Sequence, residues 1–327
     1  MASLQLSPPF SVEHQLNMEL SEDHGRSGRH LPGYPHIALD DRRRIWTFLN
    51  EEFCSNDLDK MADKLWWMAK QDSASISPLH RQRVKRRAII VTENPKLHLV
   101  WIHDRVFVKP LPRYILSHAF WQCFLSRDSS RDKQHHHRVR EAILGYLRTY
   151  RYLVRYESDF RIAQEPDLQL IPSDVTWEQF CHFGADLMSI GDSDVSPRYC
   201  YGEIRLTRLN FYAPILLRKS YFQRVEYQYG AYFARFYGPI LFWLGIASVV
   251  LSGLQVAVAV EEQSKGDRQV LSVFALGFSV AIIVFSWTLV FLLVSLLVYK
   301  VAKEWSFATR DRMRVLRERN KDSGLSP

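Results

Sequence analysis

The sequence lacks the short motifs that mark common catalytic and nucleotide-binding sites. It contains no GxSxG nucleophile elbow, no GxxxxGK(S/T) phosphate loop, no GxGxxG fingerprint and no HExxH zinc motif. These absences disfavour the familiar serine hydrolases, phosphate-loop nucleotidases, Rossmann-type dehydrogenases and zinc proteases. We therefore predict no catalytic residue, no cofactor and no metal site.

Cysteine is also scarce, with four residues in a chain of 327. They lie far apart and form no CxxC pair. Because the predicted membrane topology keeps these cysteines in the cytosol, where thiols stay reduced, we expect no disulfides. The four are Cys54, Cys123, Cys181 and Cys200.

Two histidine-containing stretches resemble chemical sites only superficially. Cys181 and His182 are neighbours, but adjacent residues on a helix point about 100° apart and cannot form a thiol and base pair. We expect both to be buried structural residues. His135–His137 fall in a polar loop with no second ligand cluster, so a metal is not expected there.

Charge is missing from two long runs near the C-terminal end, 236–260 and 270–299. The second has 30 residues, which at about 1.5 Å per residue span roughly 45 Å, against about 30 Å of bilayer hydrocarbon. We predict a two-helix transmembrane hairpin over 236–299, with a loop at 261–269. The alternative, a pair of buried helices in a soluble core, would normally show a polar face.

The predicted spans contain no Asp, Glu, Lys, Arg or His. Ion and proton pathways usually need ionisable groups within the membrane, so a transporter or channel is disfavoured. Small residues recur at four-residue spacing, which lets the hairpin pack on itself or on a second copy in a homodimer. They are Ser248 with Ser252, Ala275 with Ser279, and Gly277 with Ala281.

The distribution of Lys and Arg predicts the orientation of the hairpin. Four bases stand at 218–235 and eight at 300–321, whereas the loop has only Lys265 and Arg268. Bases collect on the cytoplasmic side, so both termini are predicted to be cytosolic. Tyrosines and phenylalanines over 221–239 indicate an interfacial aromatic belt, and the first fifty residues show no cleavable signal.

The net charge of +8 is partly a property of the tail. Residues 300–327 hold eight bases against four acids and so account for half of the excess. We therefore predict a basic cytosolic tail at 300–327 and a lipid bilayer as the partner, with no nucleic acid.

The rest of the chain predicts a disordered lead at 1–35 and a cytosolic, mainly helical α+β domain at 36–235. β-Branched and aromatic residues indicate a small antiparallel sheet. Apolar spacing predicts helices, and Thr176 with Gln179 forms a capping box at the start of one of them. The expected strands are 88–92, 97–102 and 106–109, and the expected helices are 40–53, 58–69, 112–125, 139–154 and 175–191.

Two polar clusters are the candidate sites. The stretch RQRVKRR is a candidate contact for anionic lipid headgroups, with a solvated surface as the alternative. The stretch around YGEIRLTRLN is a candidate interaction site or polar network, with a structural ion-pair network as the alternative. A raised Glu203 pKa in a pocket would favour chemistry, and a fully paired Glu203 would favour scaffolding. The residues are Arg81, Arg83, Lys85, Arg86 and Arg87 in the first cluster, and Arg198, Glu203, Arg205, Arg208 and Asn210 in the second.

Four sequence features together resemble a family of fungal integral membrane proteins that carries only a domain-of-unknown-function label. They are RYCYGEIRLTRLN, HRQRVKRR, the LHLVWIHDRVFVKPLP hairpin and the pair of hydrophobic runs. The resemblance covers roughly Pro35 to Trp305 and implies a filamentous-fungal origin and a membrane location. It brings no catalytic residues. Some members are labelled subtilisin-like proteases, but the Gly-Thr-Ser context of that catalytic serine does not occur here.

Two functions are consistent with these features. The first, which we favour, is a non-enzymatic interaction or tethering module, anchored in the membrane, that recruits a protein or a lipid headgroup. The second is a membrane-bound enzyme or biosynthetic accessory protein that acts on a lipophilic substrate.

Overall fold

The computed structural model describes residues 7–18, 20, 30–70, 72–126, 133–219, 221–223 and 229–263, together with 273, 276–289, 291–292, 294–295 and 298. The chain divides into two compact units, Met1–Arg224 and Val225–Pro327. The boundary falls about ten residues before the predicted one, because the aromatic stretch that follows Arg224 groups with the apolar helices. Most of the predicted loop and all of the predicted basic tail lie outside the described residues.

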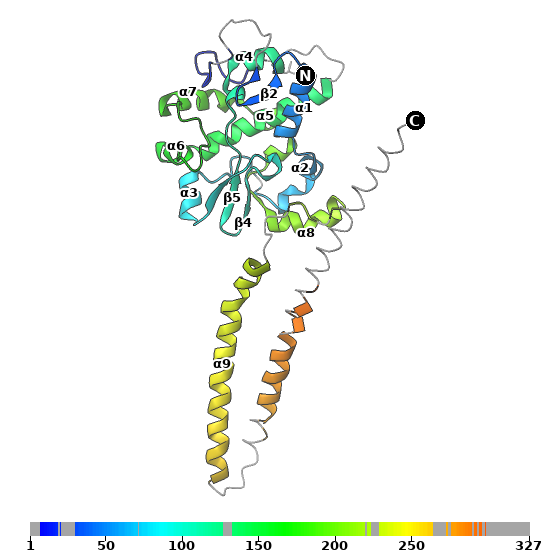
Figure 1. Ribbon diagram of the computed structural model, residues 1–327, viewed down its shortest axis with the longest axis vertical. Coiled ribbons are helices and arrows are strands. Elements are labelled where there is room, and N and C mark those ends of the chain that lie inside the picture. The colour runs from blue at the N-terminus through cyan, green and yellow to red at the C-terminus, as the bar shows by residue number, and fades with distance from the viewer. Residues whose placement is uncertain are drawn as a thin grey trace, which may run out of the picture. The chain divides into compact units, whose positions relative to one another are not determined.

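The first unit is a helical domain built around α5 (Lys133–Leu153), which runs through its middle (Figure 1). Apolar residues recur along α5 with helical spacing, and twelve of its residues are buried. The other helices pack around α5 or the sheet. They are α1 (Arg42–Phe53), α2 (Asn56–Lys60), α3 (Leu79–Val84), α4 (His118–Phe120), α6 (Glu157–Ala163), α7 (Trp177–Asp186) and α8 (Leu206–Leu216).

Three predicted helices are confirmed as α1, α5 and α7. The Asp41 side chain caps α1 by accepting a hydrogen bond from the Arg44 N–H, and Thr176 and Gln179 form the predicted capping box of α7. The start of α5 differs from the prediction, because His135–His137 belong to the helix and not to a polar loop.

Two other predicted helices are broken into short turns. The stretch expected at 58–69 is α2 followed by a 3₁₀ turn at Ala62–Trp67, and its end is drawn to the sheet because the Arg205 N–H donates to the Met68 carbonyl. The stretch expected at 112–125 is buried, as predicted, but consists of a 3₁₀ turn, α4 and a π turn. The Trp121 indole fixes its fold by donating to the Ile115 carbonyl.

The main sheet has four strands in the order β3-β5-β4-β6. The predicted antiparallel hairpin is confirmed as β4 and β5, whereas β3 pairs parallel to β5 and β6 parallel to β4, so the sheet is mixed. The connection from β3 to β4 passes through a 3₁₀ turn and is too long for a tight hairpin, so β3 does not pair with β4. The neighbour of β3 in the sheet is β5. The strands are β3 (Ala88–Val91), β4 (Val100–Ile102), β5 (Arg105–Val108) and β6 (Ile204–Arg205).

The predicted disordered lead is wrong for the residues that the structure describes. Phe10 is buried against the rings of Trp121 and Phe183, and the Leu16 N–H donates to the Leu116 carbonyl. The end of the lead forms a small antiparallel pair of strands, β1 (His30–Leu31) and β2 (Tyr34–Ala38). Scattered apolar residues without a period therefore complete the core once other elements have formed it.

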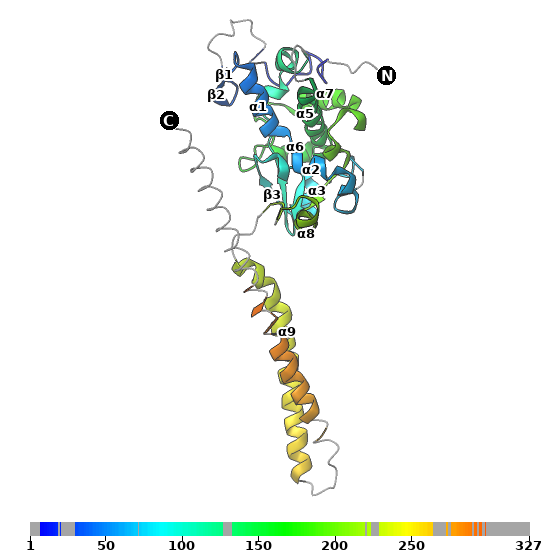
Figure 2. The ribbon, with the colours of Figure 1, turned by 90° about the vertical axis from the view of Figure 1, so that its right-hand side faces the viewer.

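The second unit contains α9 (Tyr229–Gln263), which is uninterrupted for 35 residues. Its segment Ile240–Val260 is long and apolar enough to cross a membrane and is exposed along nearly its whole length. A shorter apolar helix, Leu276–Leu289, lies beside α9 (Figure 2). One full-length candidate span is therefore shown, and the second predicted span is described over only part of its length.

Candidate interaction surfaces

Glu203 is the centre of a buried polar network at the edge of the sheet. Its side chain is fully buried just before β6, and its Oε1 accepts hydrogen bonds from the Ser77 N–H at 2.7 Å and the Gln82 amide at 2.9 Å. Its Oε2 accepts a hydrogen bond from Arg87 at 2.9 Å, and the Lys70 ammonium lies 3.5 Å from Oε1. The carboxylate is thus fully paired.

The charge balance around Glu203 keeps the carboxylate ionised. Burial alone would raise its pKa, but the Ser77 N–H and the charges of Lys70 and Lys85 outweigh burial, and the net pKa is lowered. Burial also lowers the pKa of Lys85, whose ammonium donates to the Ser77 hydroxyl. A carboxylate held in its charged form is a poor general acid or base near neutral pH, so the arrangement suits a structural ion network.

Arg198 is a second buried charge, but it serves backbone groups. Its guanidinium donates to the carbonyl oxygens of Tyr201, Gly202 and His98. Burial lowers its pKa to about 10. Through these hydrogen bonds Arg198 holds the start of the YGEIRLTRLN segment next to the residues that precede β4, so its role is to position the backbone.

The remaining three candidates of this cluster do not join Glu203. Arg205 is exposed, with its guanidinium 5.2 Å from the ring centre of Trp101. Arg208 donates to the Trp67 carbonyl, and Asn210 binds the backbone of residues 222 and 223. The predicted cluster is therefore divided. Glu203 lies in the buried network, Arg198 binds backbone carbonyls, Arg205 on β6 contacts Trp101, and Arg208 and Asn210 lie on α8.

The basic run that was expected to contact lipid headgroups is also divided. Arg87 and Lys85 belong to the Glu203 network, and Arg83 pairs with Glu165. Arg81 and Arg86 are exposed. Only part of the run therefore remains open to a headgroup.

Sequence reasoning missed most of the polar partners in the core. Lys70, Ser77 and Gln82 join the Glu203 network, although no motif singled them out. Lys109 is fully buried, and its ammonium donates to the Glu52 carboxylate, the Glu93 carboxylate and the Glu93 carbonyl oxygen. Partners this far apart in sequence leave no local pattern that could have found them.

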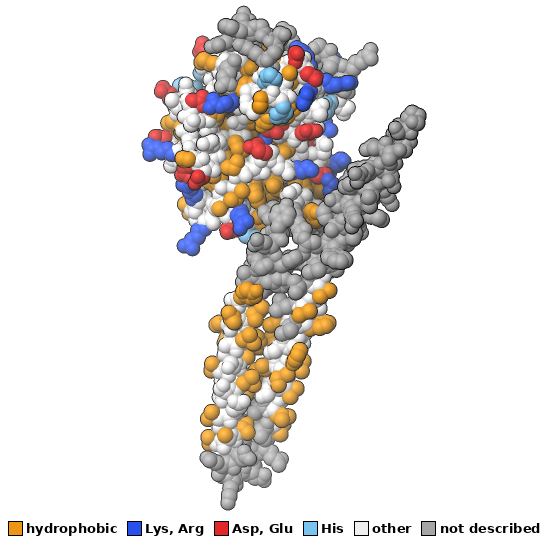
Figure 3. Space-filling model, viewed as in Figure 1, with side chains coloured by type: hydrophobic (Ala, Val, Ile, Leu, Met, Phe, Trp, Pro, Cys, Tyr) orange, Lys and Arg blue, Asp and Glu red, His pale blue; other side chains and the backbone are white. Residues whose placement is uncertain are grey.

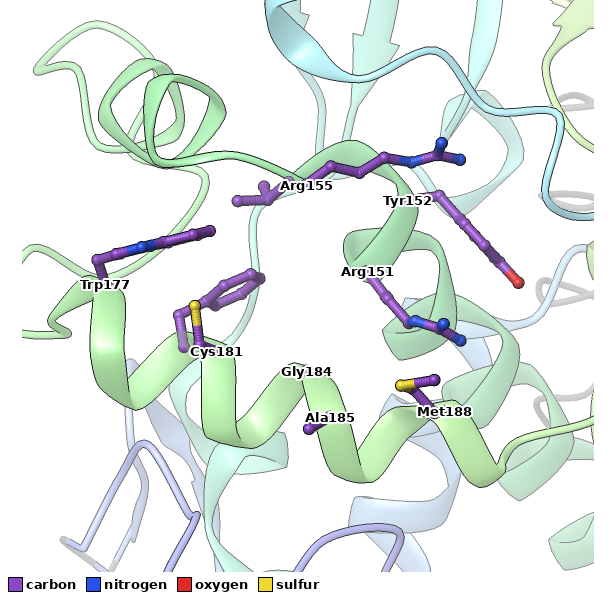
Figure 4. Close-up of a pocket in the computed structure, with 10 residues that line it drawn as sticks. Arg151, Tyr152, Arg155, Trp177, Cys181, Gly184, Ala185 and Met188 are labelled. Carbon is purple, nitrogen blue, oxygen red and sulfur yellow. The ribbon is translucent and has the colours of Figure 1, made fainter.

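A groove of about 540 Å³ lies between the C-terminal end of α5 and α7 (Figure 4). Its apolar side is α7, where Gly184 has nothing within 4 Å of a Cβ position and so leaves the floor open. Arg151 and Arg155 stand on the opposite side with Tyr152 between them, and among the described residues neither guanidinium meets a carboxylate. The other lining residues are Val154, Trp177, Phe180, Cys181, Ala185 and Met188.

The expected burial of Cys181 and His182 is wrong, because both are exposed on α7. His182 stacks on His14. Partial burial and the nearby Glu178 carboxylate raise the pKa of the Cys181 thiol, so the thiol stays protonated near neutral pH. In the histidine run, His136 stacks on Trp46, and His137 contacts Glu141 at 3.1 Å. Within the described part of the chain, no group of three or more His, Cys, Asp or Glu is placed to hold a metal, and none of the four cysteines forms a disulfide.

The described surface differs sharply between the two units. Figure 3 shows Lys, Arg, Asp and Glu distributed over the domain, and hydrophobic side chains along the apolar helices. These features define the class of protein: an α+β domain followed by a helix that is long and apolar enough to cross a membrane.

The comparison with protein families gives the family itself. Residues 45–286 match a family of unknown function (DUF6601), and the chain belongs to that family. The match covers both the domain and most of the apolar part. No curated protein and no solved structure matches the chain. A His-Gly pair of the kind found in subtilisin-like proteases does occur, at His24–Gly25, but it lies outside the described residues, and the Gly-Thr-Ser context is missing.

Proposed function

We propose that this protein is a membrane-anchored docking module, held by a two-span hairpin with both termini in the cytosol. The observation that carries the proposal is the helix segment Ile240–Val260, which bears no charge and exposes nearly all of its surface. Exposed apolar area of this extent is unfavourable in water and favourable in lipid. The domain carried by this anchor is then confined to a membrane surface.

Packing within the second unit supports the hairpin. The rings of Trp243 and Phe285 lie 4.8 Å apart, and the two residues buried on these helices are Ala247 and Ile282. Along α9 the covered positions recur every three or four residues and form a single stripe that faces a neighbouring helix. They are 240, 243, 247, 251, 254, 257 and 258. Ser248 and Ser252 lie off this stripe, so their place in a homodimer stays a prediction.

The groove on α7 supports a protein partner of defined chemistry. Arg151 and Arg155 bring two positive charges to one side of the groove, and α7 supplies an apolar side that includes Trp177 and Met188. The Arg155 guanidinium also donates to the Ala74 carbonyl. A short acidic segment carrying an apolar or aromatic side chain complements both features. We therefore assign such a segment of another protein as the occupant of the groove.

The enzymatic alternative has less support. Its best candidate, Glu203, is fully paired and has a lowered pKa, and the Lys109 ammonium uses all three donors. Neither group is free to exchange a proton with a bound substrate, because its hydrogen-bonding capacity is taken up by partners within the protein. Headgroup binding by Arg81 and Arg86, and the fungal origin that the resemblance implies, remain predictions.

Proximity labelling from the N-terminus in the native host tests the groove. The wild type is compared with an Arg151→Glu/Arg155→Glu variant and with a control that makes the same charge change on α1, Arg43→Glu/Arg44→Glu. We expect one set of neighbours in the wild type and the control that is lost in the groove variant. A peptide from the acidic segment of that neighbour should then bind the wild type and fail to bind the groove variant. An unchanged set in all three proteins would contradict the assignment.

The topology has an independent test. A glycosylation site in an extended 261–269 loop should be modified, while tags on both termini should stay accessible to protease in right-side-out endomembrane vesicles. Protected termini would contradict the proposed orientation without bearing on the groove.

A further inference from the structure

An exposed aromatic patch on α8 is explained by neither the fold nor the groove. Phe211 is 71% exposed and Ile215 73% exposed on α8, and Trp66 is 52% exposed on the 3₁₀ turn at Ala62–Trp67. We propose that this patch, here called the α8 patch, lies in the interfacial layer of the bilayer that α9 spans. This inference rests on the proposed function, and it adds which face of the domain meets lipid.

The patch is the outer face of α8. Leu206, Leu209 and Ala213 are buried and fix the inner side of α8. Phe211 and Ile215 stand four residues apart on the outer side, which places their side chains next to each other. The helix thus presents large apolar side chains away from the core.

The surroundings of the patch keep it rigid and wide. Trp66 meets Trp67 edge to face at 5.0 Å between ring centres, and Trp67 packs at 5.8 Å on the ring of Tyr212. A shallow cavity of about 450 Å³ lies between Trp67, Thr207, Arg208, Phe211 and Tyr212. Aromatic rings with one wet and one apolar side are the side chains that favour the membrane interface.

Asn210 on α8 binds the segment through which the chain leaves the domain. Its Oδ1 accepts hydrogen bonds from the N–H groups of Phe222 at 2.9 Å and Gln223 at 3.0 Å, and its Nδ2 donates to the Gln223 carbonyl at 3.0 Å. Phe222 is buried, which corrects its predicted place in the interfacial belt. The chain is therefore held on α8 as far as Gln223.

The short tether confines the domain to the membrane surface. From Gln223 to Tyr229, a fully extended chain reaches about 20 Å, and the helical residues from Tyr229 to Ile240 add about 17 Å. The sum is less than the diameter of about 45 Å expected for a domain of this size. Because Gln223 is bound to α8, this reach excludes only an orientation in which α8 lies on the far side of the domain from the bilayer.

The charges around the α8 patch suit an anionic leaflet. Arg208 belongs to the patch, and Arg218 is exposed just after α8. On the 3₁₀ turn, the exposed Asp63 and Lys64 balance each other. Anionic headgroups attract a net positive rim around an apolar centre. This combination favours an anionic lipid surface as the occupant of the α8 patch.

Photo-crosslinking of the full chain in vesicles tests the α8 patch. The probe p-benzoylphenylalanine is placed at position 211, and in a separate protein at position 188 on α7, where Met188 is similarly exposed at 62%. Both proteins are reconstituted in phosphatidylcholine vesicles with about one quarter phosphatidylserine. We expect lipid adducts at position 211 to exceed those at position 188 several-fold.

The outcomes separate this inference from the proposed function. Equal lipid adduct yields at the two positions, or crosslinks from position 211 to protein alone, would overturn the inference about the α8 patch. If the protein also resists carbonate extraction in that case, the proposed anchor still stands. Release of the protein by carbonate would overturn the anchor itself. A Phe211→Glu/Ile215→Glu variant should stay carbonate-resistant and become several-fold more accessible to protease at α8; unchanged accessibility would also overturn the inference.

Discussion

α5 and the membrane-spanning candidate in α9 have the same length, 21 residues, and opposite surroundings. α5 carries many charges, and twelve of its residues are covered by the domain, including Arg148, which donates to the Tyr199 carbonyl and pairs with Asp192. The α9 segment has no charge and almost no covering protein. The domain thus tolerates buried charge by pairing it, whereas the apolar segment depends on a medium that excludes charge.

Removing the acid from the domain's ion network should have the largest effect. Glu203→Ala leaves Arg87, Lys70 and Lys85 without their shared carboxylate, and we expect the free energy of unfolding to fall by about 3–5 kcal/mol. Urea unfolding of the full chain in detergent measures the change. Glu203→Gln keeps the Ser77 hydrogen bond and should cost less; equal losses in the two variants would show that charge is not the cause.

Adding a charge to the apolar helix should have a somewhat smaller effect. Val250 lies near the middle of Ile240–Val260, and an arginine there costs about 2.5–3.5 kcal/mol of insertion free energy. We expect Val250→Arg to lower the carbonate-resistant fraction, and Val250→Leu to leave it unchanged. If the arginine variant stays fully resistant, this segment is not the anchor.

Two glycines, one in each of these helices, sharpen the comparison further. A Cβ at Gly145 in α5 would clash with the Tyr199 ring, whereas a Cβ at Gly245 in α9 meets nothing within 4 Å. Gly145→Ala should destabilise the domain by about 1–3 kcal/mol through overpacking. Gly245→Ala should change neither folding nor insertion. Thermal unfolding of both variants decides, and a destabilised Gly245→Ala variant would mean that protein covers this face.

The smallest effect comes from pH and concerns His98. Burial, then Arg198 and Lys109, hold the pKa of its imidazole well below the usual value, and the Lys109 N–H donates to its Nδ1. The unfolded chain therefore binds a proton below about pH 6.5 that the folded chain does not. The free energy of unfolding should therefore be unaffected by His98 above this pH, and should decrease below it by at most about 1.4 kcal/mol per pH unit.

Unfolding midpoints at pH 7.5 and 5.5, measured on the wild type and on His98→Gln, test this dependence. A glutamine can accept from the Lys109 N–H and donate toward Thr149 without titrating. We expect a smaller pH dependence in the variant. The same dependence in both proteins would assign it to other groups.

The parts of the fold that were predictable are those whose pattern is local. α5 and α7 have apolar spacing that lies within one helix, α7 has a capping box as well, and the β4–β5 hairpin is marked by its turn. The parallel pairing of β3 and β6, and the packing of Phe10, depend on partners far along the chain. The same holds for the candidate site: the composition of RQRVKRR was visible, but its division between Glu203, Glu165 and solvent was not.

The order of elements also has a consequence for synthesis. Residues up to Gln223 complete the domain, because β6 closes the sheet and Asn210 holds the last described segment onto α8. At roughly 5–20 residues per second, the ribosome needs about 1–3 s more to reach Ile240 and a similar time to finish the apolar segment. Because this interval is on the order of seconds, the domain has time to begin folding while the apolar segment is still being made.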